Sequence, residues 1–268
     1  MNGKVTAERL RELNLLPDEN SKTSREHGPD AYPHLGYKVF IVGTCFLSGV
    51  IEMFAKAGCT QARTIEDADL LCFTGGEDVD PQLYGEKPLK GTYFNVARDA
   101  REIDIFTKAI ELDKPMFGIC RGMQFLHVMN GGKLWQDVDN HGWRHKIRTA
   151  AGETPDWWVS SMHHQMVIAD DTMFPLAWAV GPKGERCVSG NYIAASQTLT
   201  SNSYQEVEAA VYPNIRSIAV QGHPEVGGHP EYTIWCLNEV KNFVENGFYS
   251  DNAKPIADVE FIKKGVKE

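Results

Sequence analysis

A cysteine stands between two glycines near the middle of the chain, in the run Gly118-Ile119-Cys120-Arg121-Gly122. This is the spacing of a nucleophile elbow, a sharp strand-to-helix turn that exposes a reactive side chain. The glycines are needed because the backbone of such a turn is strained, and a Cβ on either flanking residue would collide with it. The positive end of the helix that follows favours the thiolate, so the pattern predicts a nucleophilic cysteine rather than an inert buried thiol.

The second chemistry-bearing segment is His223-Pro224-Glu225, which directly follows a predicted strand. In extended backbone the side chains of residues i and i+2 point to the same side, and the proline restrains the histidine before it to extended conformations. The carboxylate of Glu225 can therefore hold one imidazole nitrogen of His223 and fix its tautomer. The other nitrogen is then available to accept a proton from the thiol of Cys120.

Attack on a carbonyl also requires N–H donors for the oxyanion that forms. The backbone N–H of Arg121, directly after the cysteine, is one candidate. The other is expected from the turn Thr74-Gly75-Gly76, where the backbone of Gly75 and Gly76 can approach a substrate closely. A phosphate-binding loop is the rival interpretation, but no lysine follows at the Walker spacing and the Gly-x-Gly-x-x-Gly pattern is missing.

The second half of the chain is rich in histidine, so a metal centre has to be considered. The residues are His141, His145, His163, His164, His223 and His229. His141 and His145 have the i, i+4 spacing of two ligands on one helix face, but Gly142 and the preceding Asp-Asn pair argue against a helix. With no Cys-x-x-Cys pair either, the expectation is that the protein uses no metal and no other cofactor.

Alternating apolar segments are expected to position these residues. Buried strands are predicted over residues 37–43, 68–73, 116–119 and 215–221, and helices over residues 47–57, 97–112, 121–129 and 231–245. This order is typical of a doubly wound, mostly parallel α/β sheet of the flavodoxin-like kind, with right-handed crossovers. Ligands of such sheets bind at the carboxyl ends of the strands, where all three segments above lie.

The pattern changes after Gly132. Short strands are predicted there as an antiparallel extension of the sheet, over residues 134–138, 158–161, 166–169, 176–180 and 208–211. No linker-like break divides residues 37–247, which we interpret as one domain. Residues 1–36 are expected to form an N-terminal arm with a short helix over residues 7–16, and residues 248–268 a polar C-terminal tail.

Composition excludes several classes of function. The 268 residues carry a formal net charge of −9, which disfavours nucleic acid as a partner. No apolar run reaches the ~18 residues of a membrane span, and no signal-peptide pattern begins the chain. The six scattered cysteines indicate reduced thiols, and we therefore expect a cytoplasmic protein.

Taken together, the motifs resemble the class I glutamine amidotransferase-like superfamily, and within it the γ-glutamyl-γ-aminobutyrate hydrolases of peptidase family C26. The resemblance covers about residues 70–240. Besides the elbow and Gln221-Gly222-His223-Pro224-Glu225, it is carried by Gly75-Gly76-Glu77-Asp78-Val79-Asp80-Pro81, Tyr84-Gly85-Glu86, Arg98-Asp99 with Glu102, Gly131-Gly132-Lys133-Leu134-Trp135-Gln136-Asp137 and Ser161-Met162-His163-His164-Gln165.

The resemblance implies a role for each site residue. Cys120 is the expected nucleophile, His223 the general base and then acid, and Glu225 the residue that orients it. Gly76 and Arg121 donate the oxyanion N–H groups, and a γ-glutamyl thioester forms and is hydrolysed by water. Substrate contacts are expected from Gly75, from Gln124 at the glutamyl head and, on the leaving-group side, from Ser161, His163, His164 and Gln165.

Two positions depart from the family pattern. Ser160 stands where the family usually has asparagine, and Gly222 where it usually has an aromatic residue. Neither belongs to the three catalytic residues, but both can reshape the pocket, so the resemblance does not define the leaving group.

Three kinds of function follow. The first is a free-standing γ-glutamyl amide hydrolase that acts on a small molecule. The second is a glutaminase subunit that passes ammonia to a separate synthase, which must then be a partner because the sequence holds no synthase domain. The third, a regulatory pseudoenzyme, is disfavoured because cysteine, histidine and glutamate are all retained. A homodimer is the other assembly considered.

Overall fold

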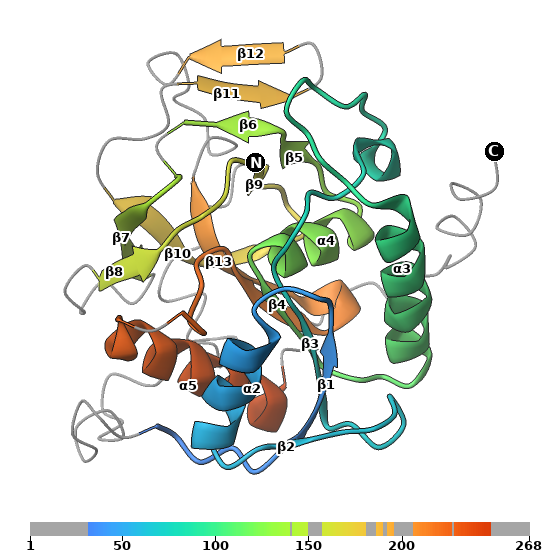
Figure 1. Cartoon of the computed structure of the whole chain (residues 1–268), viewed down its shortest axis with the longest axis vertical. Coiled ribbons are helices and arrows are strands. Elements are labelled where there is room, and N and C mark those ends of the chain that lie inside the picture. The colour runs from blue at the N-terminus through green and yellow to red at the C-terminus, as the bar shows by residue number, and fades with distance from the viewer. Residues whose placement is uncertain are drawn as a thin grey trace.

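The computed structural model describes residues 32–139, 141–149, 157–180, 186–189, 192–195, 206–226 and 228–247. A nine-stranded sheet forms their centre, in the order β2-β1-β3-β4-β14-β13-β10-β7-β8 (Figure 1). The first five strands are parallel: β1 (Lys38–Val42), β2 (Thr60–Gln61), β3 (Leu70–Phe73), β4 (Met116–Ile119) and β14 (Ser217–Val220). The predicted doubly wound α/β fold is thereby confirmed.

Helices cover both faces of the parallel half. They are α2 (Leu47–Lys56), α3 (Val96–Glu111), α4 (Arg121–Met129) and α5 (Pro230–Asn246), within two residues of the predicted bounds. Strand β3 shows why two cores exist: Leu70 and Cys72 belong to the core under α2 and α5, and Leu71 and Phe73 to the core under α3 and α4. Successive side chains of a strand point to opposite faces, so an entirely apolar strand serves both layers.

The antiparallel half of the sheet extends from β14. Its strands are β13 (Val207–Tyr212), β10 (Phe174–Val180), β7 (Arg144–Thr149) and β8 (Trp157–Ser160), each antiparallel to its neighbours. Two 3₁₀ helices, η2 (Pro81–Tyr84) and η4 (Pro213–Ile215), lie in connections. Strand β7 was not predicted, because its sequence RHKIRT has a single large apolar residue and carries no clear strand pattern.

Two of the predicted strands are not part of the central sheet, which corrects the expectation for residues 134–138 and 166–169. β5 (Leu134–Trp135) pairs with β9 (Met166–Val167), and β6 (Asp137–Val138) pairs with β11 (Arg186–Ser189), which pairs with β12 (Tyr192–Ala195). Figure 1 shows the β6, β11 and β12 sheet at one end of the molecule. Short strands of two residues carry too little pattern to specify their partners.

The predicted helix over residues 7–16 and the C-terminal tail lie outside the described residues, and the proposed domain boundaries stay predictions. Residues 32–36 are described and contain neither helix nor strand. No helix in the described ranges combines the length and the apolar character that crossing a bilayer requires.

Gly122 at the start of α4 offers a test of this packing. A Cβ there would lie 2.1 Å from the carbonyl oxygen of Phe73, which belongs to β3 and cannot move away freely. We expect Gly122→Ala to lower the free energy of unfolding by about 1–3 kcal/mol, measured by urea denaturation.

Gly142→Ala is the matched control, since a Cβ there meets no heavy atom of the described residues within 4 Å. Equal stability of the two variants would contradict the close approach of α4 to β3.

Candidate active site

The elbow places Cys120 directly between β4 and α4. Its backbone has φ 53° and ψ −108°, a conformation that is strained for a residue with a side chain. The strain is held by the chain on both sides, because the N–H of Cys120 donates to the carbonyl of Val220 at 2.8 Å and its own carbonyl accepts from the N–H of Gln124 at 3.2 Å. The thiol therefore stands at the N-terminus of α4, where the helix dipole favours its negative form.

The structure brings His223 and Cys120 to the same point of the sheet edge. A Cβ built on Gly75 would lie 3.1 Å from Cε1 of His223 and 3.7 Å from Cβ of Cys120, so both side chains lie close against the backbone of Gly75. Nδ1 of His223 lies 2.7 Å from Oε1 of Glu225, and both side chains are buried. The three residues that the sequence singled out thus meet with the expected connectivity.

The electrostatics of His223 follow from these contacts. Burial lowers the pKa of His223, but hydrogen bonds to Cys120 and to Glu225, together with their negative charges, raise it overall to about 10. At neutral pH the imidazole is therefore protonated, and it can stabilise a thiolate on Cys120 as an ion pair. Such a pair supplies both a nucleophile and a proton for a leaving group.

The glycine turn after β3 is held by Arg98. Nη2 of Arg98 donates to the carbonyls of Gly75 at 2.9 Å and Thr74 at 3.3 Å, and Nη1 lies 2.5 Å from Oε2 of Glu77. Gly76 has φ +138°, and a Cβ there would lie 2.1 Å from Nη1 of Arg98. The guanidinium thus occupies the space beside the turn and fixes the backbone that was expected to supply an oxyanion donor.

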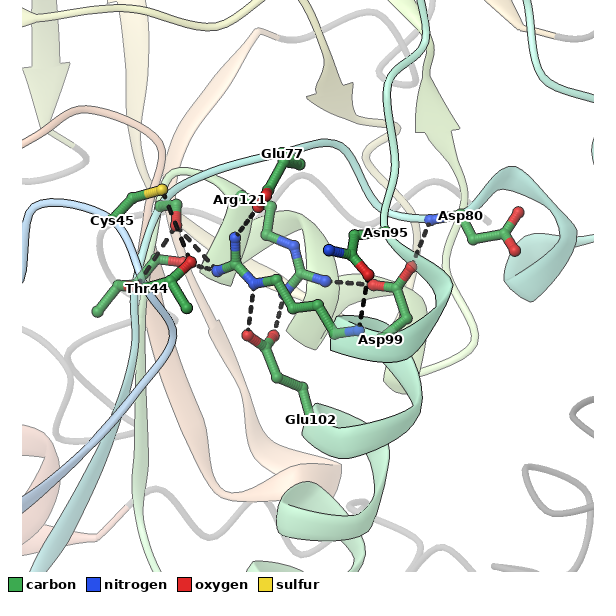
Figure 2. A network of polar contacts seen from close by, with 11 residues as sticks. Thr44, Cys45, Glu77, Asp80, Asn95, Asp99, Glu102 and Arg121 are labelled. Carbon is green, nitrogen blue, oxygen red and sulfur yellow. Dashed lines mark hydrogen bonds and ion pairs between the residues drawn. The ribbon is translucent and has the colours of Figure 1, made fainter.

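Arg121 has two separate tasks in the structure. Arg121 is the first residue of α4, so its backbone lies at the elbow, whereas its side chain enters a buried polar network shown in Figure 2. There the guanidinium contacts the carboxylates of Asp99 and Glu102, and Oε1 of Glu102 accepts from Nε of Arg98 at 2.7 Å. Glu102 therefore lies between two guanidinium groups and joins α3 to the elbow and, through Arg98, to the glycine turn.

Three buried glutamines lie behind the elbow. Nε2 of Gln124 donates to the carbonyl of Gln165 at 2.9 Å and approaches Oε1 of Gln221 at 3.4 Å. Both side-chain polar atoms of Gln165 and Nε2 of Gln221 lack a hydrogen-bond partner among the described residues. Unsatisfied buried amides are unusual, and here they form a set of donors and acceptors that a polar ligand could use.

The remaining residues expected to contact substrate are used within the protein. The hydroxyl of Ser161 donates to the carbonyl of His141 at 2.6 Å, and Nδ1 of His163 lies 2.9 Å from the carbonyl of Gln165. His164 is half-exposed and faces Asp78, whose carboxylate is 3.1 Å from its Nε2 and raises the pKa of this histidine. The expectation that these residues line the leaving-group side stays a prediction.

Phe46 is a site residue that the sequence analysis missed. It follows the end of β1 with φ 53°, and its ring centroid lies 5.3 Å from that of His223 in an edge-on arrangement. Its contact depends on where β1 lies in the sheet, and no local pattern of the sequence could reveal it. Arg98 and Glu102 did carry a signal, the i, i+4 spacing of an ion pair on one helix.

A second group of ionisable side chains comes together on the antiparallel half of the sheet. Ligand atoms of His141, His145 and Glu208 all lie within 4.8 Å of one another. His145 belongs to β7 and Glu208 to β13, so the residues meet through tertiary structure. The i, i+4 spacing of His141 and His145 does not reflect a helix.

The sequence of this chain matches a known protein family. The family model described as Peptidase C26 matches residues 19–225. A stretch of 83 residues is 41% identical to protein NtpR of Enterococcus hirae, and covers 31% of this chain and 35% of that protein. A stretch of 119 residues is 34% identical to the glutamine amidotransferase-like protein YvdE of Lactococcus lactis subsp. lactis, and covers 37% of this chain and 50% of that protein. The chain thus spans at most half the length of these two relatives.

A solved structure supports the fold. A chain of the PurLQS structure from Thermotoga maritima superposes with a TM-score of 0.53 at 15% identity, over 80% of this chain and 100% of that chain. At this identity the similarity shows the fold alone, which is the one predicted from the sequence.

The buried network of Arg98, Glu102 and Arg121 can be tested by its effect on the free energy of unfolding. Glu102→Gln removes the negative charge between Arg98 and Arg121 and should lower the free energy of unfolding by about 3 kcal/mol, because buried guanidinium charge is left undercompensated. Chemical denaturation measures the change. Glu111→Gln on the exposed side of the same helix is the control, and similar small effects of both substitutions would show that the network contributes little.

The raised pKa of His223 predicts how Cys120 reacts with iodoacetamide. Because the imidazolium is retained well above neutral pH and favours a negative sulfur beside it, His223→Asn should slow alkylation of Cys120 at pH 7 by about tenfold or more.

Peptide-resolved mass spectrometry in a Cys45→Ala background separates Cys120 from the neighbouring thiol at Cys45. Equal alkylation rates of Cys120 at pH 7 with and without His223 would rule out the ion pair.

Proposed function

This chain belongs to the peptidase C26 family, and on that premise we propose that it hydrolyses a γ-glutamyl amide through a thioester on Cys120. The observation that carries the proposal is the meeting of Cys120 with the Glu225-held imidazole of His223 at a strained strand-to-helix turn. A thiol needed only for packing would require neither the strained backbone nor a buried histidine and carboxylate beside it.

In the proposed reaction the thiolate of Cys120 attacks the γ-carbonyl carbon, and the negative charge moves to the carbonyl oxygen. The backbone N–H groups of Arg121 and Gly76 stabilise this oxyanion. His223 gives its proton to the amine as the C–N bond breaks, which leaves a γ-glutamyl thioester and a neutral imidazole. Water then attacks the thioester, His223 takes the proton of that water, and glutamate leaves as the thiolate is restored.

The contacts around the two oxyanion donors support their assignment. Arg98 holds the carbonyls of Thr74 and Gly75, and Arg121 is held by its side chain in the network with Asp99 and Glu102. Both donor residues are therefore tied to α3 before substrate arrives. Donors that need no reorganisation during the reaction stabilise the transition state more strongly than mobile ones.

For the glutamyl head, the proposal uses the glutamines behind the elbow. Gln165 and Gln221 retain unsatisfied amide atoms, while Gln124 donates to the backbone carbonyl of Gln165 and to Oε1 of Gln221. Amide groups are suited to the polar backbone atoms of a γ-linked glutamate, which offer both donors and acceptors.

Ammonia delivery to a separate synthase is the second candidate, favoured by the similarity to the glutamine amidotransferase-like protein YvdE. The two functions share the thioester and differ in the amine released. Robust hydrolysis of γ-glutamyl amines by the chain alone supports the first. Glutaminase activity that appears only when a synthase is added supports the second.

Cys120→Ala tests the nucleophile. We expect a loss of turnover of at least about 10⁴-fold, because no other group can form the thioester. Steady-state hydrolysis of a panel of γ-glutamyl amides measures this, and mass spectrometry of the wild-type protein should find a γ-glutamyl adduct on Cys120. Cys45→Ala, which removes a thiol beside the same glycine turn, should retain near-normal turnover. Near-normal activity of Cys120→Ala would refute the assignment.

Comparison of His223→Ala with Glu225→Gln tests the division of roles. His223 carries the proton, whereas Glu225 only orients the imidazole. We therefore expect His223→Ala to lower kcat at least about tenfold more than Glu225→Gln does. Equal or reversed losses, with both variants folded by circular dichroism, would contradict these roles.

A further inference from the structure

The histidine and glutamate group on the antiparallel half has no part in the proposed reaction. It consists of His141 before β7, His145 on β7 and Glu208 on β13, with His163 packed against them. The ring centroids of His141 and His145 are 5.0 Å apart, and those of His141 and His163 are 4.8 Å apart. All of these side chains are buried or nearly so, with exposed fractions of 3% for His141, 13% for His145 and 0% for Glu208.

The polar atoms of this group are close together, but most of them are not satisfied. Nε2 of His145 lies 2.9 Å from Oε1 of Glu208, an ion-pair contact, and Nδ1 of His141 lies 3.7 Å from the same oxygen. Both ring nitrogens of His141, Nδ1 of His145 and Oε2 of Glu208 have no hydrogen-bond partner among the described residues. Four buried polar atoms in this state are costly unless another group satisfies them.

His163 adds another unsatisfied ring nitrogen to the group. Its Nδ1 lies 2.9 Å from the carbonyl of Gln165, which can only accept, so this nitrogen must carry the proton. Nε2 of His163, on the opposite side of the ring, has no hydrogen-bond partner among the described residues. A backbone carbonyl bound to the far nitrogen is the arrangement typical of a metal-binding histidine.

We propose that His141, His145 and Glu208 bind a divalent transition-metal ion, with Zn²⁺ the ion they suit best, while His163 packs against His141 beside this set. Two imidazoles with one carboxylate form a donor set typical of zinc. Ligands of a tetrahedral zinc ion are about 3.3 Å apart. The present separations of up to 4.8 Å therefore close by small rotations of the rings.

A plain ion pair explains the group less completely. An imidazolium at His145 would pair with Glu208, but the ring nitrogens of His141 and Nε2 of His163 would stay unsatisfied. Glu206, whose carboxylate lies 3.6 Å from Nε2 of His141, adds a second negative charge at the same place. A dication offsets the charge of the Glu208 carboxylate and accepts the lone pairs of neutral imidazoles at once.

The position of the group gives the ion a structural consequence. The carbonyl of His141 accepts from the hydroxyl of Ser161 at 2.6 Å and from the N–H of His163 at 3.3 Å, and the N–H of His223 donates to the carbonyl of Ser160 at 3.0 Å. An ion bound by His141 would therefore fix the segment that follows β8 and, through it, the backbone at His223.

The test is a zinc titration of the full chain against a chromogenic chelator after treatment with EDTA. It is done in the Cys120→Ala background, because a thiolate beside a histidine could bind zinc itself. We expect one equivalent of Zn²⁺, bound at least about tenfold more weakly in Glu208→Gln and in His145→Gln. His164→Gln, outside the group and half-exposed, is the matched control and should retain the affinity.

Two measurements on the unsubstituted ligand set decide the matter even if a variant fails to fold. Co²⁺ should give the intense visible d–d bands of a tetrahedral site, and Zn²⁺ should raise the midpoint of thermal unfolding relative to the EDTA-treated protein. Absence of both effects overturns the proposal. So does an affinity that is the same in Glu208→Gln, His145→Gln and the His164→Gln control.

Discussion

The carboxylate of Glu102 between the guanidinium groups of Arg98 and Arg121 is the interaction on which the candidate active site depends. Arg121 is the first residue of α4, and Arg98 holds the turn after β3. Two separate strand ends are thereby fixed to one helix, α3. Buried charges of this kind stabilise little in net terms, but they tolerate only one arrangement of their partners. The network is therefore better understood as a device that sets geometry than as a source of stability.

The sheet supplies what the network cannot. Strands β3, β4 and β14 are parallel neighbours, so their carboxyl ends bring Gly75, Cys120 and His223 to one edge of the sheet. The strained backbone at Cys120 is compatible with this because the N–H of the cysteine still pairs with Val220 on β14. The same topology explains why a histidine about a hundred positions further along the chain can serve as its partner.

Much of this could be predicted because the signals are local. A few neighbouring residues define each of three features: the elbow, the His-Pro-Glu segment and the Arg98 to Glu102 spacing. The strands of the parallel half can be predicted because they are apolar throughout. Strand β7 could not be predicted in this way, because its sequence is polar and it forms a strand by pairing with β10 and β8. The meeting of His145 with Glu208 was equally hard to predict, because it depends on β7 and β13 lying on either side of β10 in the sheet and not on spacing along the chain.

The side chains of Cys120 and His223 are almost completely enclosed, with exposed fractions of 5% and 3%, and the ring of Phe46 closes one side of the imidazole. With so little of the sulfur open to solvent, a departing amine and an incoming water molecule compete for the same approach to the thioester carbon. In the proposed reaction we therefore expect the amine to leave before the second half of the cycle begins. An amine that stays bound would take back the acyl group.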